Sequence, residues 1–374
     1  MSLLARLLRL VIRAPGLDEP YRPRPPDPSP ASPLTAARNL VLPDPLWQAL
    51  GEFESAFRRD VIADAPIAQI VDGIAALPPD KLGRAAYEIN RATDLSWCAY
   101  GSPRPRAQAW LAREPSLAVL FLFHRNGFVR QAALGALPAT AVTPFVFAGV
   151  ARRLNDWVEQ VRGAAVVCAA RVFADLDAAI VAEAARHLVI VTRHWRRWDE
   201  GQAEVMGKAF SRPDVIARLA ETIRTARSGP MGALLRLVLR WPAMDAHLLA
   251  LSQEAFLPDV RAVASQILLE GRVRWSLGKR HQWIDKKYNQ WIWIPVYDER
   301  PVARPLPPEE LIARAARDRS PRVRRVAADA LVAQHATLVD ADAIIAQLIA
   351  DENRSVRERA DFVRRRRASL TSSP

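Results

Sequence analysis

The sequence of 374 residues predicts an all-α fold of repeated helical pairs, with one short tryptophan-rich segment that has the character of a β-hairpin. Apolar residues recur at spacings of three and four over most of the chain, which is typical of a buried helical face. Five segments that join a Val-Arg pair to an alanine-rich stretch recur at multiples of about 33 residues. Residues 271–300 depart from this pattern, because they hold four of the eleven tryptophans and β-branched residues that favour strands.

The composition indicates a folded intracellular protein with an acidic partner. Half of the residues are hydrophobic, which is enough for a substantial core. The net charge of +13 favours nucleic acid, an anionic membrane or an acidic protein as partner, although 48 of the 53 cations are arginine, as a GC-rich genome alone would produce. Cys98 and Cys168 lie far apart, which argues against a disulfide scaffold or a cysteine zinc site and favours a reducing cytoplasm. The longest apolar runs are shorter than the ~18 residues that a membrane span needs.

The first 45 residues predict an arm on a tether. Residues 1–13 form an amphipathic basic helix, which either docks on a membrane surface or partner or packs on its own protein. Its docking residues are Arg6, Arg9 and Arg13 on one face and Leu3 and Leu7 on the other. Residues 14–45 hold ten prolines, so they form an extended linker.

Helical repeats are predicted over residues 46–270 and 305–367, with a basic insert at 271–304 between them and a tail at 368–374. The repeat is marked by five valines, each followed directly by arginine: Val129, Val161, Val260, Val323 and Val356. Their separations of 32, 99, 63 and 33 residues are close to one, three, two and one periods. The pattern is weakest between residues 171 and 255.

This pattern resembles the HEAT-repeat family over roughly residues 105–367. The resemblance implies a right-handed α-solenoid, in which stacked helical pairs share one core and the second helices line a concave binding face. It also implies a ladder of hydrogen bonds between the Asp and Arg of each repeat. The matching pairs are Asp156 with Arg162, Asp318 with Arg324, and Asp351 with Arg357. At 257–269 the acid, Asp259, stands only two residues before Arg261, where the spacing does not match.

The insert is the candidate binding surface. Alternation along a strand places Trp291 and Trp293 on one face and Ile292 and Ile294 on the other. Three interpretations remain open: a protein interface, packing against the solenoid core, or a stacking surface for single-stranded nucleic acid. The predicted partner-binding residues are Trp275, Lys279, Arg280, Trp283, Lys286, Lys287, Trp291 and Trp293.

The sequence holds no phosphate-binding loop, zinc-protease, serine-hydrolase or dinucleotide motif, and its six histidines do not cluster. No metal, cofactor or small-molecule substrate is therefore predicted. Trp195 and Asp199 are spaced to share a helical face, a weak similarity to helical-repeat DNA glycosylases, but the favoured interpretation is Trp195 or Trp198 in the core and Asp199 as a helix cap. Further basic surface is predicted at Arg193, Arg196, Arg197, Arg364, Arg365, Arg366 and Arg367.

The sequence thus predicts a non-enzymatic cytoplasmic scaffold or adaptor that binds an acidic protein partner within a multiprotein assembly. The alternative is a nucleic-acid-binding solenoid, with a glycosylase-like repair protein as its catalytic form. Salt dependence separates the two, because phosphate contacts release counterions on binding.

Overall fold

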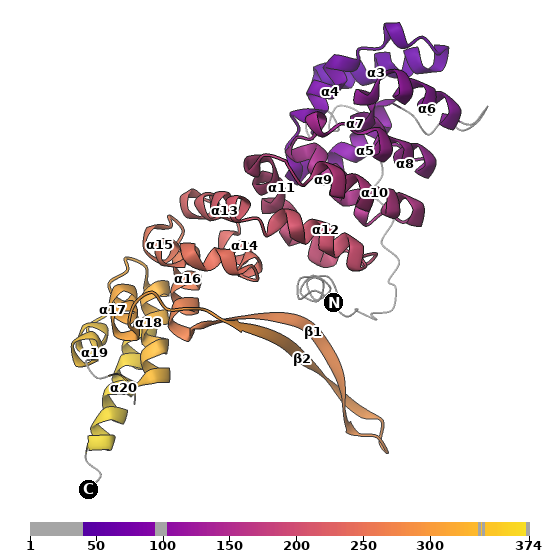
Figure 1. The fold of residues 1–374 in the computed structure, drawn as a ribbon. Helices are drawn as coiled ribbons and strands as arrows, with labels where there is room; N and C mark the ends of the chain where they lie inside the picture. Colours follow the sequence, from indigo (N-terminus) through magenta and orange to yellow (C-terminus); the bar gives the residue numbers. More distant parts are fainter. Residues whose placement is uncertain (1–39, 94–102, 336–337, 339–340, 372–374) are drawn as a thin grey trace, which may run out of the picture. The chain divides into compact units, whose positions relative to one another are not determined.

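The computed structural model describes residues 40–93, 103–335, 338 and 341–371. These residues form eighteen α-helices and one two-stranded antiparallel sheet, which confirms the predicted helical fold with a hairpin at the tryptophan-rich segment. The chain divides into unit 1, Met1–Phe210, and unit 2, Ser211–Pro374 (Figure 1). The predicted N-terminal helix and most of the proline-rich linker lie outside the described residues. The end of that linker is folded, because Leu42 is buried and the first described helix begins at Asp44.

Unit 1 is helical throughout its described residues. Its α-helices are α3 (Asp44–Arg59), α4 (Ile67–Ala75), α5 (Leu82–Thr93), α6 (Pro103–Arg113), α7 (Ala118–Phe121), α8 (Gly127–Ala136), α9 (Pro144–Leu154), α10 (Glu159–Val172), α11 (Ala178–Val191) and α12 (Glu200–Phe210). Short 3-10 turns η2 to η6 stand between them at Ile62–Asp64, Pro79–Lys81, Pro115–Leu117, Ala139–Ala141 and Thr192–His194. Three helices of this unit have a side-chain cap at the N-terminus. Asn126, Thr143 and Asp177 accept main-chain N–H groups in the first turns of α8, α9 and α11.

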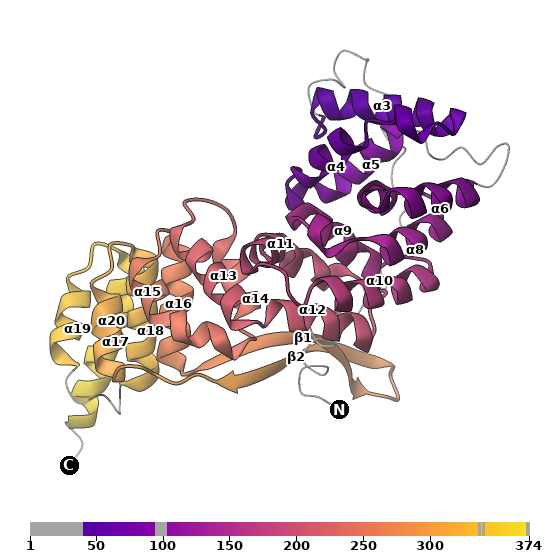
Figure 2. The same cartoon turned by 45° about the horizontal axis from the view of Figure 1, so that its top comes forward.

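Unit 2 combines helices with the hairpin. Its elements are α13 (Pro213–Thr225), α14 (Met231–Val238), η7 (Pro242–His247), α15 (Leu248–Glu254), α16 (Pro258–Glu270), β1 (Arg272–Asp285), β2 (Gln290–Pro301), α17 (Pro308–Ala316), α18 (Pro321–Gln334), α19 (Asp342–Ile349) and α20 (Arg354–Thr371). Helix α18 packs against α16 on one side and against α20 on the other (Figure 2). Because α20 continues to Thr371, the predicted tail at 368–374 begins inside this helix.

The five Val-Arg pairs mark the same place in each helical pair. All five valines, Val129, Val161, Val260, Val323 and Val356, are 0% exposed. They stand in the first turns of α8, α10, α16, α18 and α20, where an apolar side chain faces the neighbouring helices. The spacing seen in the sequence is therefore a spacing of buried core positions.

The arginines that follow these valines form a ladder, but with different partners from those that the family resemblance implied. Arg130 donates from Nε and Nη2 to both carboxylate oxygens of Asp156, at 2.9 and 2.7 Å. Arg324 donates in the same way to both carboxylate oxygens of Asp351, and we call this two-bond contact a fork. Each of these two arginines thus binds the acid of the following segment, whereas the hydrogen bonds of Arg162 and Arg357 go to main-chain oxygens. Within its own segment each arginine reaches only a main-chain oxygen, as where Arg324 Nη1 donates to the Asp318 carbonyl at 3.0 Å.

The segment with the irregular spacing also joins this ladder. Arg261 forks Asp318 at 2.7 and 2.9 Å and donates from Nη1 to the main-chain oxygen of Ala255, which stands where three of the other segments have an acid. Asp259 is not the ladder acid, since its carboxylate pairs with Arg322 on the exposed side. Arg261 joins the ladder without an acid in its own segment, because Asp318 of the following segment supplies the carboxylate.

Candidate interaction surfaces

The hairpin leaves α16 through a turn that requires glycine. Gly271 ends α16 with φ +67°, a left-handed conformation that side chains with a Cβ disfavour, and a Cβ there would lie 3.1 Å from the Arg304 guanidinium. At the other end, Arg300 forks Asp245 at 2.6 Å and donates to the Leu239 carbonyl. These contacts fix the base of the hairpin on unit 2, from which the ribbon extends past the helices (Figure 1).

The register of the two strands places four rings on one face. Trp283 stands opposite Trp291, and His281 opposite Trp293. The ring centroid of His281 lies 4.7 Å from that of Trp283 and 4.7 Å from that of Trp291. Trp291 and Trp293 meet edge to face, with their ring centroids 5.6 Å apart. We call His281, Trp283, Trp291 and Trp293 the ring cluster. Its three tryptophans are 43 to 48% exposed, a large apolar surface left open to solvent.

The opposite face of the ribbon is aliphatic, as alternation predicted. Ile292 pairs with Gln282 and Ile294 with Arg280, one position out of phase with the ring cluster. Ile292 is exposed and Ile294 half-buried. A two-stranded hairpin is marginally stable in water by itself. A ribbon with apolar side chains on both faces therefore has the composition of a surface that a partner covers.

Trp275 does not belong to this surface, which corrects its place among the predicted binding residues. A register shift between Ser276 and Gly278 inserts one extra residue into β1. Such a β-bulge exchanges the faces of the residues on its two sides. Trp275 therefore lies on the opposite face from Trp283, at the base of the hairpin, and is only 6% exposed. It is a core residue of unit 2.

The positive charge of the hairpin is concentrated toward its tip. Near the base, Arg272 and Arg274 both pair with Glu299 at 3.5 Å, and Arg300 is held by Asp245. The four tip cations, Lys279, Arg280, Lys286 and Lys287, are exposed and meet no carboxylate within the described part of the chain. The Asp285 carboxylate instead accepts the N–H of Lys287 at 2.8 Å in the turn.

Trp195 and Asp199 do not share a helical face, so the geometry proposed for a glycosylase is wrong. The chain from Trp195 to Asp199 is non-helical and joins η6 to α12. Asp199 caps α12: its Oδ1 accepts the N–H of Gly201 at 3.1 Å, while its own N–H donates to Gln202 at 3.0 Å. This reciprocal pair is a capping box, which gives the carboxylate a structural role.

The arginines predicted to form basic surfaces differ in whether they are paired. Of the C-terminal arginines, Arg364 and Arg365 pair with Asp361, and Arg367 donates to the carbonyls of His335 and Leu338. Arg366 is exposed, as are Arg196 and Arg197 in unit 1, whereas the side chain of Arg193 lies outside what the structure describes. These arginines lie in both units.

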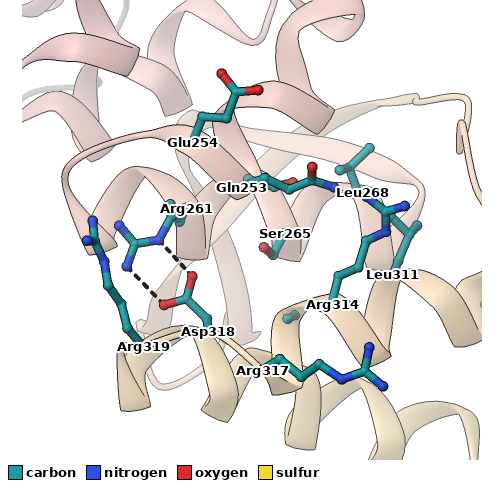
Figure 3. Close-up of a pocket in the computed structure, with 12 residues that line it drawn as sticks. Gln253, Glu254, Arg261, Ser265, Leu268, Leu311, Arg314, Arg317, Asp318 and Arg319 are labelled. Carbon is teal, nitrogen blue, oxygen red and sulfur yellow. Dashed lines mark hydrogen bonds and ion pairs between the residues drawn. The ribbon is translucent and has the colours of Figure 1, made fainter.

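A cavity of about 480 Å3 lies in unit 2 between α15, α16, α17 and the turn that follows α17. Figure 3 shows the Arg261–Asp318 fork bridging it, with Arg314 and Arg317 along its rim. Arg314 pairs with Glu310 at 2.6 Å. The polar groups at its centre already satisfy one another, so this cavity belongs to the ladder.

A larger cleft, of about 870 Å3, lies in unit 1 and was not foreseen from the sequence. Its wall combines α5, the α7–α8 turn, the end of α9, α11 and the segment after η6. The one signal in the sequence was His124, which stands where the next segment has the ladder acid Asp156. Its Nδ1 accepts the N–H of Asn126 at 2.9 Å, as Asp156 Oδ1 accepts that of Val158 at 3.0 Å.

No group of His, Cys, Asp and Glu side chains suited to a metal ion occurs among the described residues. Nor does any helix in the described ranges combine the length and apolar character needed to cross a bilayer. Cys168 is buried in α10 as a small core residue, while Cys98 lies outside the described residues. No protein-family model matches the sequence, and no curated protein is similar to it.

Proposed function

We propose that the chain is a non-enzymatic scaffold of the HEAT-repeat kind, a right-handed α-solenoid whose hairpin binds an acidic protein partner in a multiprotein assembly. The observation that carries the binding role is the exposed ring cluster beside the four unpaired tip cations. Tryptophan and arginine are the residues most enriched at energetic centres of protein interfaces. The carboxylates of an acidic partner would neutralise the tip cations, and an apolar groove of the same partner would cover the rings.

The repeated architecture rests on the Val-Arg positions. A helical pair cannot bury its apolar face alone, so stacked pairs must share a core, and a buried valine recurs at each repeat position. The forward forks of Arg130, Arg261 and Arg324 support the same interpretation, because each ties one helical pair to the next.

A protein partner accounts for the hairpin better than a nucleic acid does. Bases stack on open ring faces. In the ring cluster, however, Trp291 and Trp293 cross at 84° and His281 and Trp283 at 87°, so ring edges cover part of those faces. The aliphatic side, where Ile292 and Ile294 lie beside Arg280, offers no aromatic stacking platform for bases. A protein groove can enclose both faces of the ribbon.

The test is capture from a nuclease-treated lysate of the source organism, followed by binding with purified components. We expect an acidic protein that the double variant Trp291→Ala/Trp293→Ala loses, with the Kd of the purified pair raised about thirtyfold or more, as for a hot spot worth about 2 kcal/mol. Lys286→Gln/Lys287→Gln should weaken binding most at low salt. Phe128→Ala and Lys208→Gln are the controls, an exposed aromatic residue and an exposed lysine of unit 1.

Nucleic acid is tested in parallel by fluorescence anisotropy with labelled single- and double-stranded DNA and RNA at about 50 and 200 mM salt. Four phosphate contacts from the tip cations would lower the affinity on the order of 100-fold across this range. Tight binding of that kind, abolished by the hairpin variants, would replace the protein partner with the nucleic-acid alternative.

A further inference from the structure

The cleft in unit 1 combines aromatic walls with cationic groups. Tyr87 on α5 and Trp157 after α9 line it and are 64 and 71% exposed, and Trp195 lines it half-buried. Large aromatic side chains open to solvent at a concave surface are typical of sites that hold a flat ring. The volume of about 870 Å3 lies within the range of small-molecule sites.

The cleft has more positive charge than its own carboxylates neutralise. Five arginines line it against two acids, Asp80 and Asp156. Asp156 is held by Arg130 and Arg153, and Asp80 pairs with Lys81. The remaining cations of the lining, Arg125, Arg152 and Arg197, form no ion pair with a carboxylate in the described ranges, although the Asp156 charge acts on Arg152.

Burial lowers the pKa of two groups at the wall of the cleft, and neighbouring arginines add to both shifts. Burial, with the nearby charges of Arg152 and Arg130, lowers the pKa of Arg153 to about 10, even though Asp156 opposes the shift. Burial, followed by the Arg130 charge, lowers the pKa of His124 to about 4. His124 is therefore neutral at pH 7.

A buried donor also lines the cleft without a partner. His124 is 2% exposed, and its Nδ1 accepts the Asn126 N–H, so in the neutral ring the proton is on Nε2. That Nε2 has no hydrogen-bond partner, and a buried N–H of this kind costs stability unless something accepts it. An anion in the cleft would supply the acceptor.

From these observations we propose that the cleft of unit 1 binds a nucleotide, with its phosphate held by Arg152 and the Nε2–H of His124 and its base against Tyr87 and Trp157. A guanidinium and a neutral N–H donor are suited to phosphate oxygens, and the exposed rings are suited to a base. This site lies in unit 1 and is independent of the hairpin surface in unit 2, so either proposal stands if the other fails.

The probe is adenosine 5′-monophosphate, titrated into the full chain by isothermal calorimetry at low salt. Adenosine and inorganic phosphate are titrated separately. We expect the nucleotide to bind at least tenfold more tightly than either part. Arg152→Gln should raise its Kd at least tenfold by removing a cation, and Tyr87→Ala should do so by removing a ring. Arg113→Gln, an exposed arginine of unit 1 outside the cleft, should change the Kd less than twofold.

His124→Asp is the sharpest variant, because aspartate occupies this place in the following segment and can accept the Asn126 N–H. It should fold with a thermal midpoint no lower than that of the parent chain and lose nucleotide binding, since a carboxylate would then face the phosphate. Unchanged affinity in Arg152→Gln and His124→Asp would overturn the proposal, as would binding of a short oligonucleotide without binding of the mononucleotide. Equal affinity for inorganic phosphate and nucleotide would show that the base makes no contact that contributes to binding, and would contradict the nucleotide assignment.

Discussion

Arg324 forks Asp351 through Nε and Nη2, at 2.5 and 3.0 Å, across the gap between one helical pair and the next. This hydrogen-bonded fork lowers the pKa of the Asp351 carboxyl, in spite of its partial burial. The same contact recurs from Arg130 to Asp156 and from Arg261 to Asp318. It is a charge-assisted, bidentate hydrogen bond in a partly desolvated place, where its loss is expected to cost more than that of a surface ion pair.

Two aspartates of unit 2 test the ladder directly. Asp318→Asn leaves Arg261, whose side chain is 2% exposed, without its carboxylate and should lower the free energy of unfolding by about 3 kcal/mol. Asp259→Asn breaks an ion pair of similar composition whose partners are about half exposed, and should cost less than about 1 kcal/mol. Urea unfolding of the full chain, followed by circular dichroism, measures both. Equal losses would show that the forward fork does not stabilise unit 2.

Stability should fall as the pH drops from 6.5 to 4. His124 has its pKa lowered to about 4 by burial and the Arg130 charge, whereas an unfolded histidine titrates at about 6.5. Between these values the unfolded chain binds one proton more, so the stabilisation is complete above pH 6.5 and is lost as the pH falls toward 4. The loss is on the order of 3 kcal/mol. Thermal unfolding from pH 7.5 to 4.5 measures it.

His124→Asn is the control for that pH dependence. Its side-chain oxygen can still accept the Asn126 N–H, but it does not titrate. Stability of this variant should change much less between pH 6.5 and 4 than that of the parent chain. If the two chains lost stability in parallel, another group would be responsible.

Two tryptophans of the hairpin should respond differently to truncation. Trp275→Ala empties a buried site at the base and should destabilise unit 2 by about 3 kcal/mol. Trp291→Ala removes a ring that is 43% exposed and should cost about 1 kcal/mol, mainly from lost ring contacts. Thermal unfolding of each variant checks this. A loss at Trp291 as large as that at Trp275 would place the ring cluster in the core and remove the proposed interface.

Asp199 should behave as a cap. Asp199→Ala removes the acceptor for the Gly201 N–H and should cost about 1 kcal/mol of unfolding free energy. Asp199→Asn retains a good capping group and should stay within a few tenths of a kcal/mol of the parent chain. Base excision from alkylated DNA should be absent in both and in the parent. Excision by the parent that Asp199→Asn abolishes would restore the enzyme hypothesis.

The sequence by itself determined which face of the repeat helices is buried and where the helices give way to strands. The valine of each Val-Arg pair is buried because helical periodicity, a local property, sets which face turns inward. Residues 272–285 and 290–301 form strands because aromatic and β-branched side chains favour a pleated surface.

Only the tertiary structure decided which groups meet. Arg261 and Asp318 are 57 residues apart, and no local pattern assigns one to the other in preference to Asp259. A single bulge in β1 moved Trp275 to the opposite face from Trp283, because one extra residue reverses the alternation of a strand. The cleft around His124 draws its walls from segments between residues 80 and 197, which only the packing of unit 1 brings together. Periodicity fixes the face of an element, whereas long-range packing fixes its partners.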